Sequence, residues 1–66
     1  MPKTLEELAQ MIAARDGISY GEGLAAVRDC AQEMEWAFMN GNLDDAEEIL
    51  RTSLQLELDY LDLFIF

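Results

Sequence analysis

Residues 19–41, SYGEGLAAVRDCAQEMEWAFMNG, have the period of an amphipathic helix. Ser19 and Glu22 have the spacing of a capping box, in which each side chain accepts a hydrogen bond from the other residue's backbone N–H. Gly41 is a typical helix terminator. We therefore predict a long helix that follows Ser19 and ends near Asn40, with apolar residues on one face: Leu24, Val27, Ala31, Met34 and Phe38.

Two details of this helix are left open by the pattern. Gly21 and Gly23 weaken the first turn by about 1 kcal/mol each relative to alanine, so a start as late as residue 22 is also consistent with the sequence. Trp36 and Met39 lie off the apolar stripe. They either widen the buried face or contact something outside the domain.

Shorter helices are predicted on both sides of this stretch. Thr4 and Glu7 have capping-box spacing, and Gly17 is a natural stop, so a first helix is expected over 5–15. Asn42 is expected to be the N-cap of a third helix, because acidic residues follow in its first turns, where they complement the helix dipole. Its apolar side consists of Ala46, Ile49, Leu50 and Leu54.

The last residues fit two patterns. Alternate residues from Leu54 to Tyr60 are apolar, as in a strand, whereas Leu54, Leu58, Leu61 and Ile65 fit a helix. We expect a break near 55–58 and a short helix over 60–65, with Asp59 as a possible cap. The predicted fold is all-α: one small domain over 1–66, a compact bundle of three helices plus a short C-terminal helix or extended tail.

A chain of 66 residues is marginally stable unless something reinforces it. Its one cysteine, Cys30, excludes an intrachain disulfide, and the chain has no histidine. Oligomerisation or partner binding remains as a source of added stability. We expect Cys30 to be a buried structural thiol, because surrounding acids raise the pKa of a thiol and oppose its reaction as a nucleophile.

Catalytic and metal-binding motifs are poorly matched. Nucleophilic catalysis needs a nearby base, and the chain has no histidine and only Lys3 as a lysine. Asn40, Asn42 and Asp44 alternate like the start of a calcium loop, but Asp45 replaces its glycine and Arg51 its closing glutamate. We therefore expect no enzyme activity, no metal and no cofactor.

Charge gives the strongest indication of a partner. Fourteen acidic residues oppose four basic ones, for a net charge of −10. Such a surface repels nucleic acid and anionic membranes and attracts basic proteins. The sequence has no signal-peptide pattern and no apolar run near the roughly 20 residues of a membrane span. We therefore expect a cytoplasmic protein that binds a basic surface of another protein.

The acids are concentrated after residue 28. Asp29 and Glu33, and likewise Asp44 and Glu48, are spaced by one helical turn, where like charges slightly destabilise a helix. Carboxylates at this spacing roughly imitate the phosphates of a nucleic-acid strand. The alternative is a solvated face that only keeps the protein soluble. The predicted partner-binding residues are Asp29, Glu33, Glu35, Trp36, Asp44, Asp45, Glu47 and Glu48.

The C-terminal segment is the second candidate surface. Large apolar residues at the end of a chain are costly if they are exposed to water. They either pack on the first two helices or form an interface with a second subunit or a partner, and a homodimer is consistent with this pattern. The residues expected at such an interface are Tyr60, Leu63, Phe64 and Phe66.

Most of the chain resembles short acidic proteins encoded by bacterial prophages and other mobile elements. The resemblance lies in the stretches GISY (17–20), NGNLD (40–44), AEEIL (46–50) and DYL (59–61). Similar sequences are expected to carry a glycine soon after Leu54 and a proline before DYL, where this chain has Gln55 and Leu58. Some proteins of this kind are anti-CRISPRs or other inhibitors of host defence, many of which occupy nucleic-acid sites.

Two functions are consistent with these features. The first, which the resemblance favours, is a non-catalytic phage-type inhibitor whose acidic face mimics nucleic acid and binds a nucleic-acid-binding host protein such as a CRISPR effector. The second is a small homodimeric interaction module, or an antitoxin-like regulator, that binds through the apolar C-terminal segment.

Overall fold

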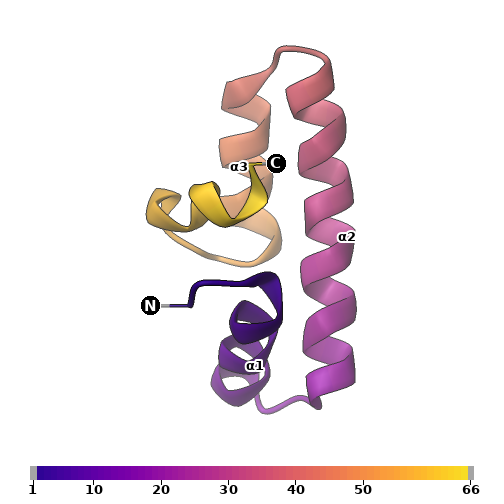
Figure 1. Cartoon of the computed structure of the whole chain (residues 1–66), viewed down its shortest axis with the longest axis vertical. Coiled ribbons are helices and arrows are strands. Elements are labelled where there is room, and N and C mark those ends of the chain that lie inside the picture. The colour runs from indigo at the N-terminus through magenta and orange to yellow at the C-terminus, as the bar shows by residue number, and fades with distance from the viewer. Residues whose placement is uncertain (1, 66) are drawn as a thin grey trace.

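The computed structural model describes residues 2–65 of the chain, and every regular element in this range is helical. Three α-helices, α1 (Leu5–Asp16), α2 (Tyr20–Met39) and α3 (Leu43–Ser53), are followed by a 3-10 helix, η1 (Leu58–Phe64) (Figure 1). The predicted all-α fold with three main helices is confirmed.

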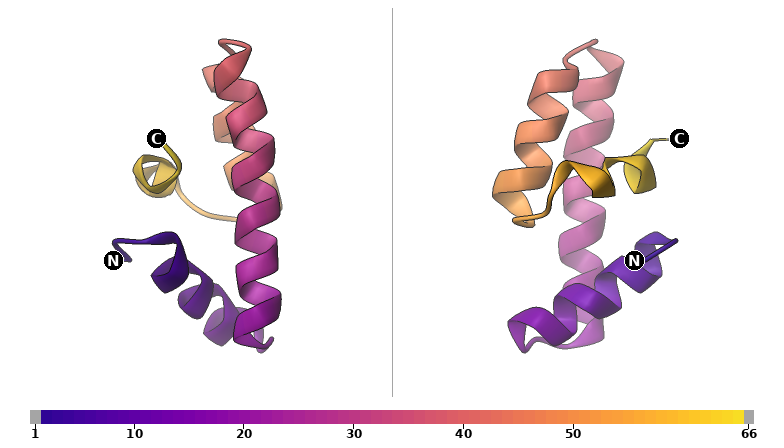
Figure 2. Two further views of the ribbon diagram at one scale, coloured as in Figure 1. Left: turned by 45° about the vertical axis from the view of Figure 1, so that its right-hand side comes forward. Right: turned by 90° about the vertical axis from the view of Figure 1, so that its left-hand side faces the viewer.

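Helix α2 is the longest helix, and all the other helices pack against it. Its 20 residues, at about 1.5 Å each, extend about 30 Å and account for most of the 33 Å long axis. Helix α1 packs along the N-terminal half of α2 and α3 along the C-terminal half, both on the same side (Figures 1 and 2). The 3-10 helix lies between them and contacts α3 and α2. The bundle is therefore two helical hairpins that share their longest helix.

The helix ends largely follow the predicted capping signals. The hydroxyl of Thr4 accepts a hydrogen bond from the N–H of Glu7 at 3.1 Å. The carboxylate of Glu7, however, accepts from the N–H of Lys3 at 2.7 Å, one residue before the predicted donor. Ser19 and Glu22 form the full capping box, with bonds of 3.1 and 3.2 Å, so α2 begins at Tyr20 despite its glycines.

The turn between α2 and α3 differs from the prediction in one respect. Gly41 has a positive φ of 72° and directly follows the C-cap of α2, as expected of a terminating glycine. Asn42 precedes α3, but its side chain makes no capping hydrogen bond. The predicted side-chain cap is therefore absent, and the acids of the first turn, Asp44 and Asp45, favour this helix start through the dipole instead.

The tail combines both predicted patterns. Leu54 and Leu56 are buried while Gln55 and Glu57 are exposed, so alternation of the strand type holds where the chain leaves α3. A helix then follows, but it is a 3-10 helix that begins at Leu58 after Glu57, not an α-helix over 60–65 capped by Asp59. The 3-10 helix begins with a hydrogen bond from the N–H of Tyr60 to the carbonyl of Glu57 at 3.1 Å.

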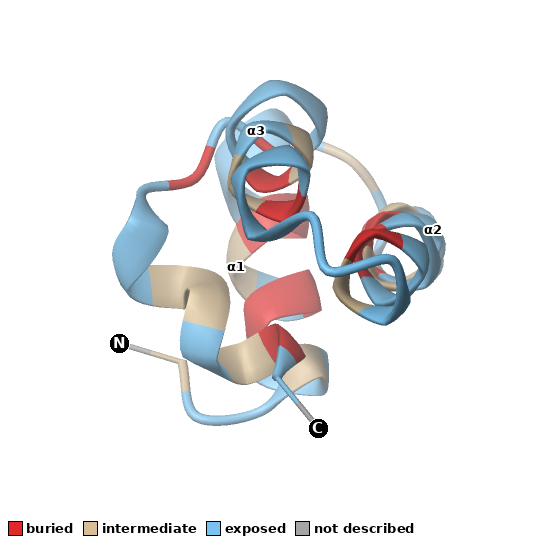
Figure 3. Cartoon of the chain, turned by 90° about the horizontal axis from the view of Figure 1, so that it is seen from above, coloured by how far each residue is buried: buried red, intermediate tan, exposed pale blue. Residues whose placement is uncertain are grey.

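All four helices contribute to one core. The buried stretches of the α-helices lie toward the middle of the molecule (Figure 3), and Phe64 of η1 belongs to the same buried cluster. No buried side-chain polar atom among the described residues lacks a hydrogen-bond partner. The largest fully buried side chains are Phe64, Leu8, Ile12, Met34, Leu50, Val27 and Cys30.

Helices α1 and α2 come closest at Gly23. A Cβ atom at this position would lie 2.7 Å from the carbonyl oxygen of Ala9 and 3.3 Å from the Cβ of Ala13. The first distance is shorter than real Cβ contacts, and the obstacle is backbone. Gly23 therefore sets the spacing of the first hairpin, whereas a Cβ at Gly21 would meet only the Ser19 hydroxyl oxygen at 4.0 Å.

The pair Gly23→Ala and Gly21→Ala tests this contact. Both substitutions raise helix propensity by up to about 1 kcal/mol, but only the first forces α1 away from α2, at a cost of about 1–3 kcal/mol. We expect Gly23→Ala to lower the free energy of unfolding in urea and Gly21→Ala to leave it unchanged or raise it. Equal stability of the two variants would show that the helices are not held at this distance.

The backbone of Gln55 provides a second test. Its φ of 54° lies in the left-handed region, which costs a residue other than glycine about 1–2 kcal/mol. We expect Gln55→Gly to stabilise the fold by about 0.5–1 kcal/mol, after allowing for the greater freedom of glycine in the unfolded chain. Gln55→Ala is the control, because alanine keeps the conformational cost. Thermal unfolding followed by circular dichroism would show no gain for glycine over alanine if the conformation were unstrained.

Candidate partner-binding surface

The predicted acidic residues are placed around both helices of the second hairpin. Asp29, Glu33, Glu35, Asp44, Asp45 and Glu48 are exposed and Glu47 is half-buried. Glu33 and Glu35 flank the buried Met34, and with about 100° per residue they lie about 160° apart around α2. The acids therefore surround this end of the molecule and do not form one flat face.

On α3 the same arrangement recurs. Asp44 and Glu48 are one turn apart on its outer side. Asp45 and Glu47 flank the buried Ala46, again about 160° apart. A partner that binds one side of the hairpin would consequently meet only some of the predicted residues.

These carboxylates form no ion pair with any of residues 2–65. In the described part of the chain the ion pair is Arg15–Asp16, on α1, with Nε and Oδ1 2.9 Å apart. The hydrogen bond to Asp16 raises the pKa of Arg15, and the same bond lowers the pKa of Asp16. Arg28 and Arg51 lie on α2 and α3 but form no ion pair with the described residues. The acids of the second hairpin outnumber these two arginines, so its net charge is negative.

Trp36 is on the solvent side of α2, with 63% of its surface exposed. It follows Asp29 by seven residues and Glu33 by three, so the three side chains share one side of the helix. The structure thus answers the open question about Trp36 and Met39, since neither widens the core. The exposed indole therefore lies on the same side of α2 as two carboxylates that form no ion pair with the described residues.

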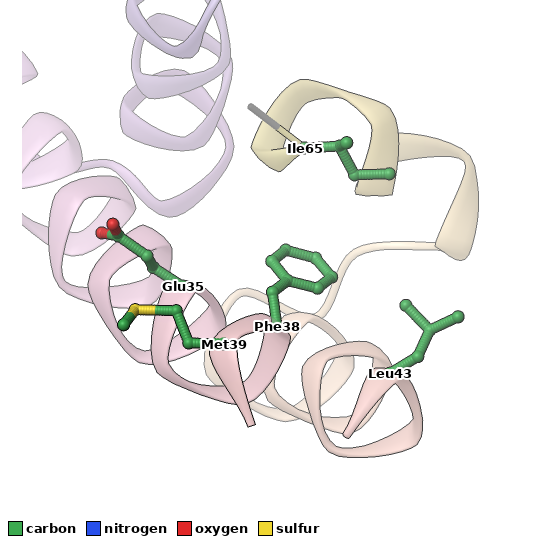
Figure 4. A pocket seen from close by; sticks show the side chains of 5 residues that line it. All are labelled: Glu35, Phe38, Met39, Leu43 and Ile65. Atoms are coloured by element: carbon green, nitrogen blue, oxygen red, sulfur yellow. The ribbon is translucent and has the colours of Figure 1, made fainter. Parts of the chain in front are cut away.

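A shallow groove of about 430 Å³ lies at the same end of the molecule. It is lined by Glu35, Phe38, Met39, Leu43 and Ile65, which come from the end of α2, the start of α3 and the residue after η1. Figure 4 shows the ring of Phe38 between Met39 and Leu43, with Ile65 across the groove. Sequence reasoning did not select Leu43 or Ile65, although the off-stripe position of Met39 was a signal.

The predicted self-association residues mostly belong to the fold. Phe64 is fully buried, and Leu63 is half-buried against the core. Tyr60 is half-buried, and its hydroxyl donates to Sδ of Met11 on α1 at 3.6 Å. Phe66 lies outside the described residues. Of the two predicted roles for this segment, packing in the core is therefore the one that Phe64 fills.

Cys30 is buried in the core, and its thiol donates to Sδ of Met34 at 3.7 Å. Burial, and to a lesser extent the charge of Glu33, raises the pKa of the thiol to about 11. The prediction of a buried thiol is confirmed, with desolvation as the larger cause of its raised pKa. A thiol with this pKa stays protonated near neutral pH and is a poor nucleophile.

Residues 2–65 contain neither a cluster of metal ligands nor a membrane-spanning helix. No three cysteine or acidic side chains converge there in a way that would hold a metal ion. No helix in this range combines the length and the apolar character needed to cross a membrane. Comparisons with protein-family models, curated proteins and solved structures find no match to the chain.

The thiol of Cys30 makes stability depend on pH. Below its ordinary pKa of about 9 the thiol is protonated in both states, whereas between pH 9 and about 11 the unfolded chain loses a proton that the folded chain keeps. Stability should therefore fall over this range by on the order of 2 kcal/mol. Urea unfolding of wild type and Cys30→Ala from pH 8 to 11 isolates this effect. The stability advantage of wild type should shrink, and a constant difference would contradict the raised pKa.

Proposed function

We propose that this protein is a non-catalytic inhibitor that binds a nucleic-acid-binding protein through the acidic surface of α2 and α3. The observation that carries the proposal is the exposed Trp36 beside Asp29 and Glu33, which have no ion-pair partner among the described residues. An exposed tryptophan is a typical energetic centre of a protein interface. Unpaired acids around it favour a basic partner.

The proposed mechanism is competition with nucleic acid for a basic groove. Carboxylates one helical turn apart are separated by about 6 Å along the axis, and a groove that binds successive phosphates presents cations to such a row. The net charge of −10 accelerates encounter with a basic surface. Trp36 then provides the apolar contact that slows dissociation, because it loses its exposed surface in the complex.

The resemblance to short acidic phage and prophage proteins supports a more specific form of the proposal. In that form the protein acts in the cytoplasm of a bacterial host and blocks a defence protein, for example a CRISPR effector. The size of the chain is consistent with this role, because a domain of 66 residues is large enough to cover a binding groove and an inhibitor of this kind needs no active site.

A homodimeric interaction module or antitoxin-like regulator is the second candidate. The observation that favours it is Ile65, which is 55% exposed beside Met39 and Leu43. In this case the acids only confer solubility. The burial of Phe64 leaves fewer apolar side chains for such an interface than the sequence indicated.

Matched variants distinguish these functions. Immobilised protein would capture partners from bacterial lysate, and mass spectrometry would identify them. We expect Asp29→Asn/Glu33→Gln and Trp36→Ala each to lower the affinity for the captured protein at least tenfold. The control, Glu6→Gln/Asp62→Asn, removes two charges elsewhere and should change affinity less than threefold. Binding should also weaken steeply as salt increases, and duplex DNA or RNA should compete.

Two results would contradict the proposed function. A partner whose affinity ignores salt, competing nucleic acid and both α2 variants would exclude nucleic-acid mimicry. Concentration-dependent sedimentation of the wild type, abolished by Ile65→Ser, would favour the homodimeric module instead.

A further inference from the structure

The groove at the end of the second hairpin is bordered by exposed apolar side chains. Met39 is 73% exposed, Leu43 50% and Ile65 55%, and they border the half-buried ring of Phe38. Phe38, Met39 and Leu43 come from the end of α2 and the start of α3, and the tail brings the distant Ile65 to the same place (Figure 4). Clustered apolar side chains on a small charged protein indicate a contact surface more than chance exposure.

The charge at the groove is entirely negative. Glu35 is part of its wall, and Glu47 lies one turn after Leu43 on the same side of α3. Of the described residues that line the groove, none is basic. An apolar ligand that also carried a positive charge would therefore gain both burial and an ion pair with Glu35.

A second copy of the chain fits this surface poorly. A standard interface needs about 800 Å² from each partner, close to a fifth of the 4372 Å² of accessible surface. Such an area would extend from the groove over the acids of α2 and α3. Two chains of charge −10 would then be brought together with acids facing acids.

The form of the ligand follows from the elements that make the groove. The described residues contain no strand, so they offer no sheet edge to which an extended peptide could be added. A groove bordered by two helices is typical of helix-in-groove binding, in which apolar anchors of one helix face are buried. Lys or Arg one turn from such an anchor would reach the wall of the groove.

The geometry points to this groove as the docking site for a basic amphipathic helix of the partner, with an apolar side chain packed on Phe38 and a Lys or Arg paired with Glu35. The inference rests on the proposed function, because it assumes a basic partner protein. It adds a second contact, which is separate from the side of α2 that carries Trp36, since Glu35 and Trp36 are about 100° apart around the helix.

Synthetic peptides test the groove without knowledge of the natural partner. The probe is an amphipathic helical peptide of Leu and Lys, compared with a Leu/Glu peptide and with a Lys/Gln peptide that lacks apolar anchors. Methyl-labelled methionines report the location, because Met39 lines the groove whereas Met11 lies on α1 against Tyr60. We expect the Leu/Lys peptide to shift the Met39 methyl signal saturably and to leave the Met11 signal unchanged.

Substitutions then assign the two parts of the contact. Leu43→Ser should weaken binding of the Leu/Lys peptide at least fivefold, and Glu35→Gln about threefold. The controls are Leu58→Ser, another exposed leucine, and Glu6→Gln, an acid on α1, which should each change affinity less than twofold. Circular dichroism of each variant confirms that the fold is retained, as expected for exposed positions.

Several outcomes would overturn the inference. Equal binding of the Leu/Glu peptide would show that the groove does not select a basic ligand, and equal binding of the Lys/Gln peptide would show attraction by charge only. A shift of Met39 with protein concentration in the absence of peptide would identify a second copy as the occupant. Because the groove variants retain Trp36, Asp29 and Glu33, failure here leaves the proposed function intact. Failure of the α2 variants likewise leaves peptide binding in the groove intact.

Discussion

The contact between Gly23 and the backbone of Ala9 is the constraint on which the arrangement of the helices depends. With 2.7 Å between the carbonyl oxygen and the position of a Cβ atom, only glycine lets α1 approach α2 this closely. The approach brings Leu8 and Ile12 into contact with the buried face of α2. Helix α1 therefore packs on the N-terminal half of α2, and the C-terminal half of α2 packs against α3.

Because α2 contacts all the other helices, so short a chain can form one core without a disulfide. Cys30 and Met34 are central to α2, where the core residues of α1, α3 and η1 meet them. Phe64 and Leu56, from the tail, complete the core on the side that the three α-helices leave uncovered. Each hairpin is incomplete without the other elements, so the stabilising burial is distributed over the whole chain. The tail contributes to this burial through Leu56 and Phe64.

Local signals in the sequence predicted the helices well. The apolar period, the capping box of Ser19 and Glu22, and the terminators Gly17 and Gly41 act within a few residues and can be recognised without a structure. The role of Gly23 could not be predicted, because it depends on the distance to another helix. The same holds for Gln55, whose left-handed backbone lies between two buried leucines.

The candidate site was predictable only in part. The composition identified the acids and Trp36, but periodicity within one helix does not show how two helices orient their acids relative to each other. The groove joins Leu43 to Ile65, residues whose proximity depends on the path of the tail. Sequence patterns therefore predicted which residue types are on the surface, whereas their arrangement depends on tertiary packing.

The exposure of Trp36 also determines what fluorescence can report. It is the only tryptophan of the chain, and its indole is largely in water when the protein is folded. Its emission spectrum should consequently differ little between the folded and unfolded states, which makes it a weak probe of denaturation. The same indole would move to a drier environment in any complex that covers α2, so an unlabelled protein carries its own optical sensor of association.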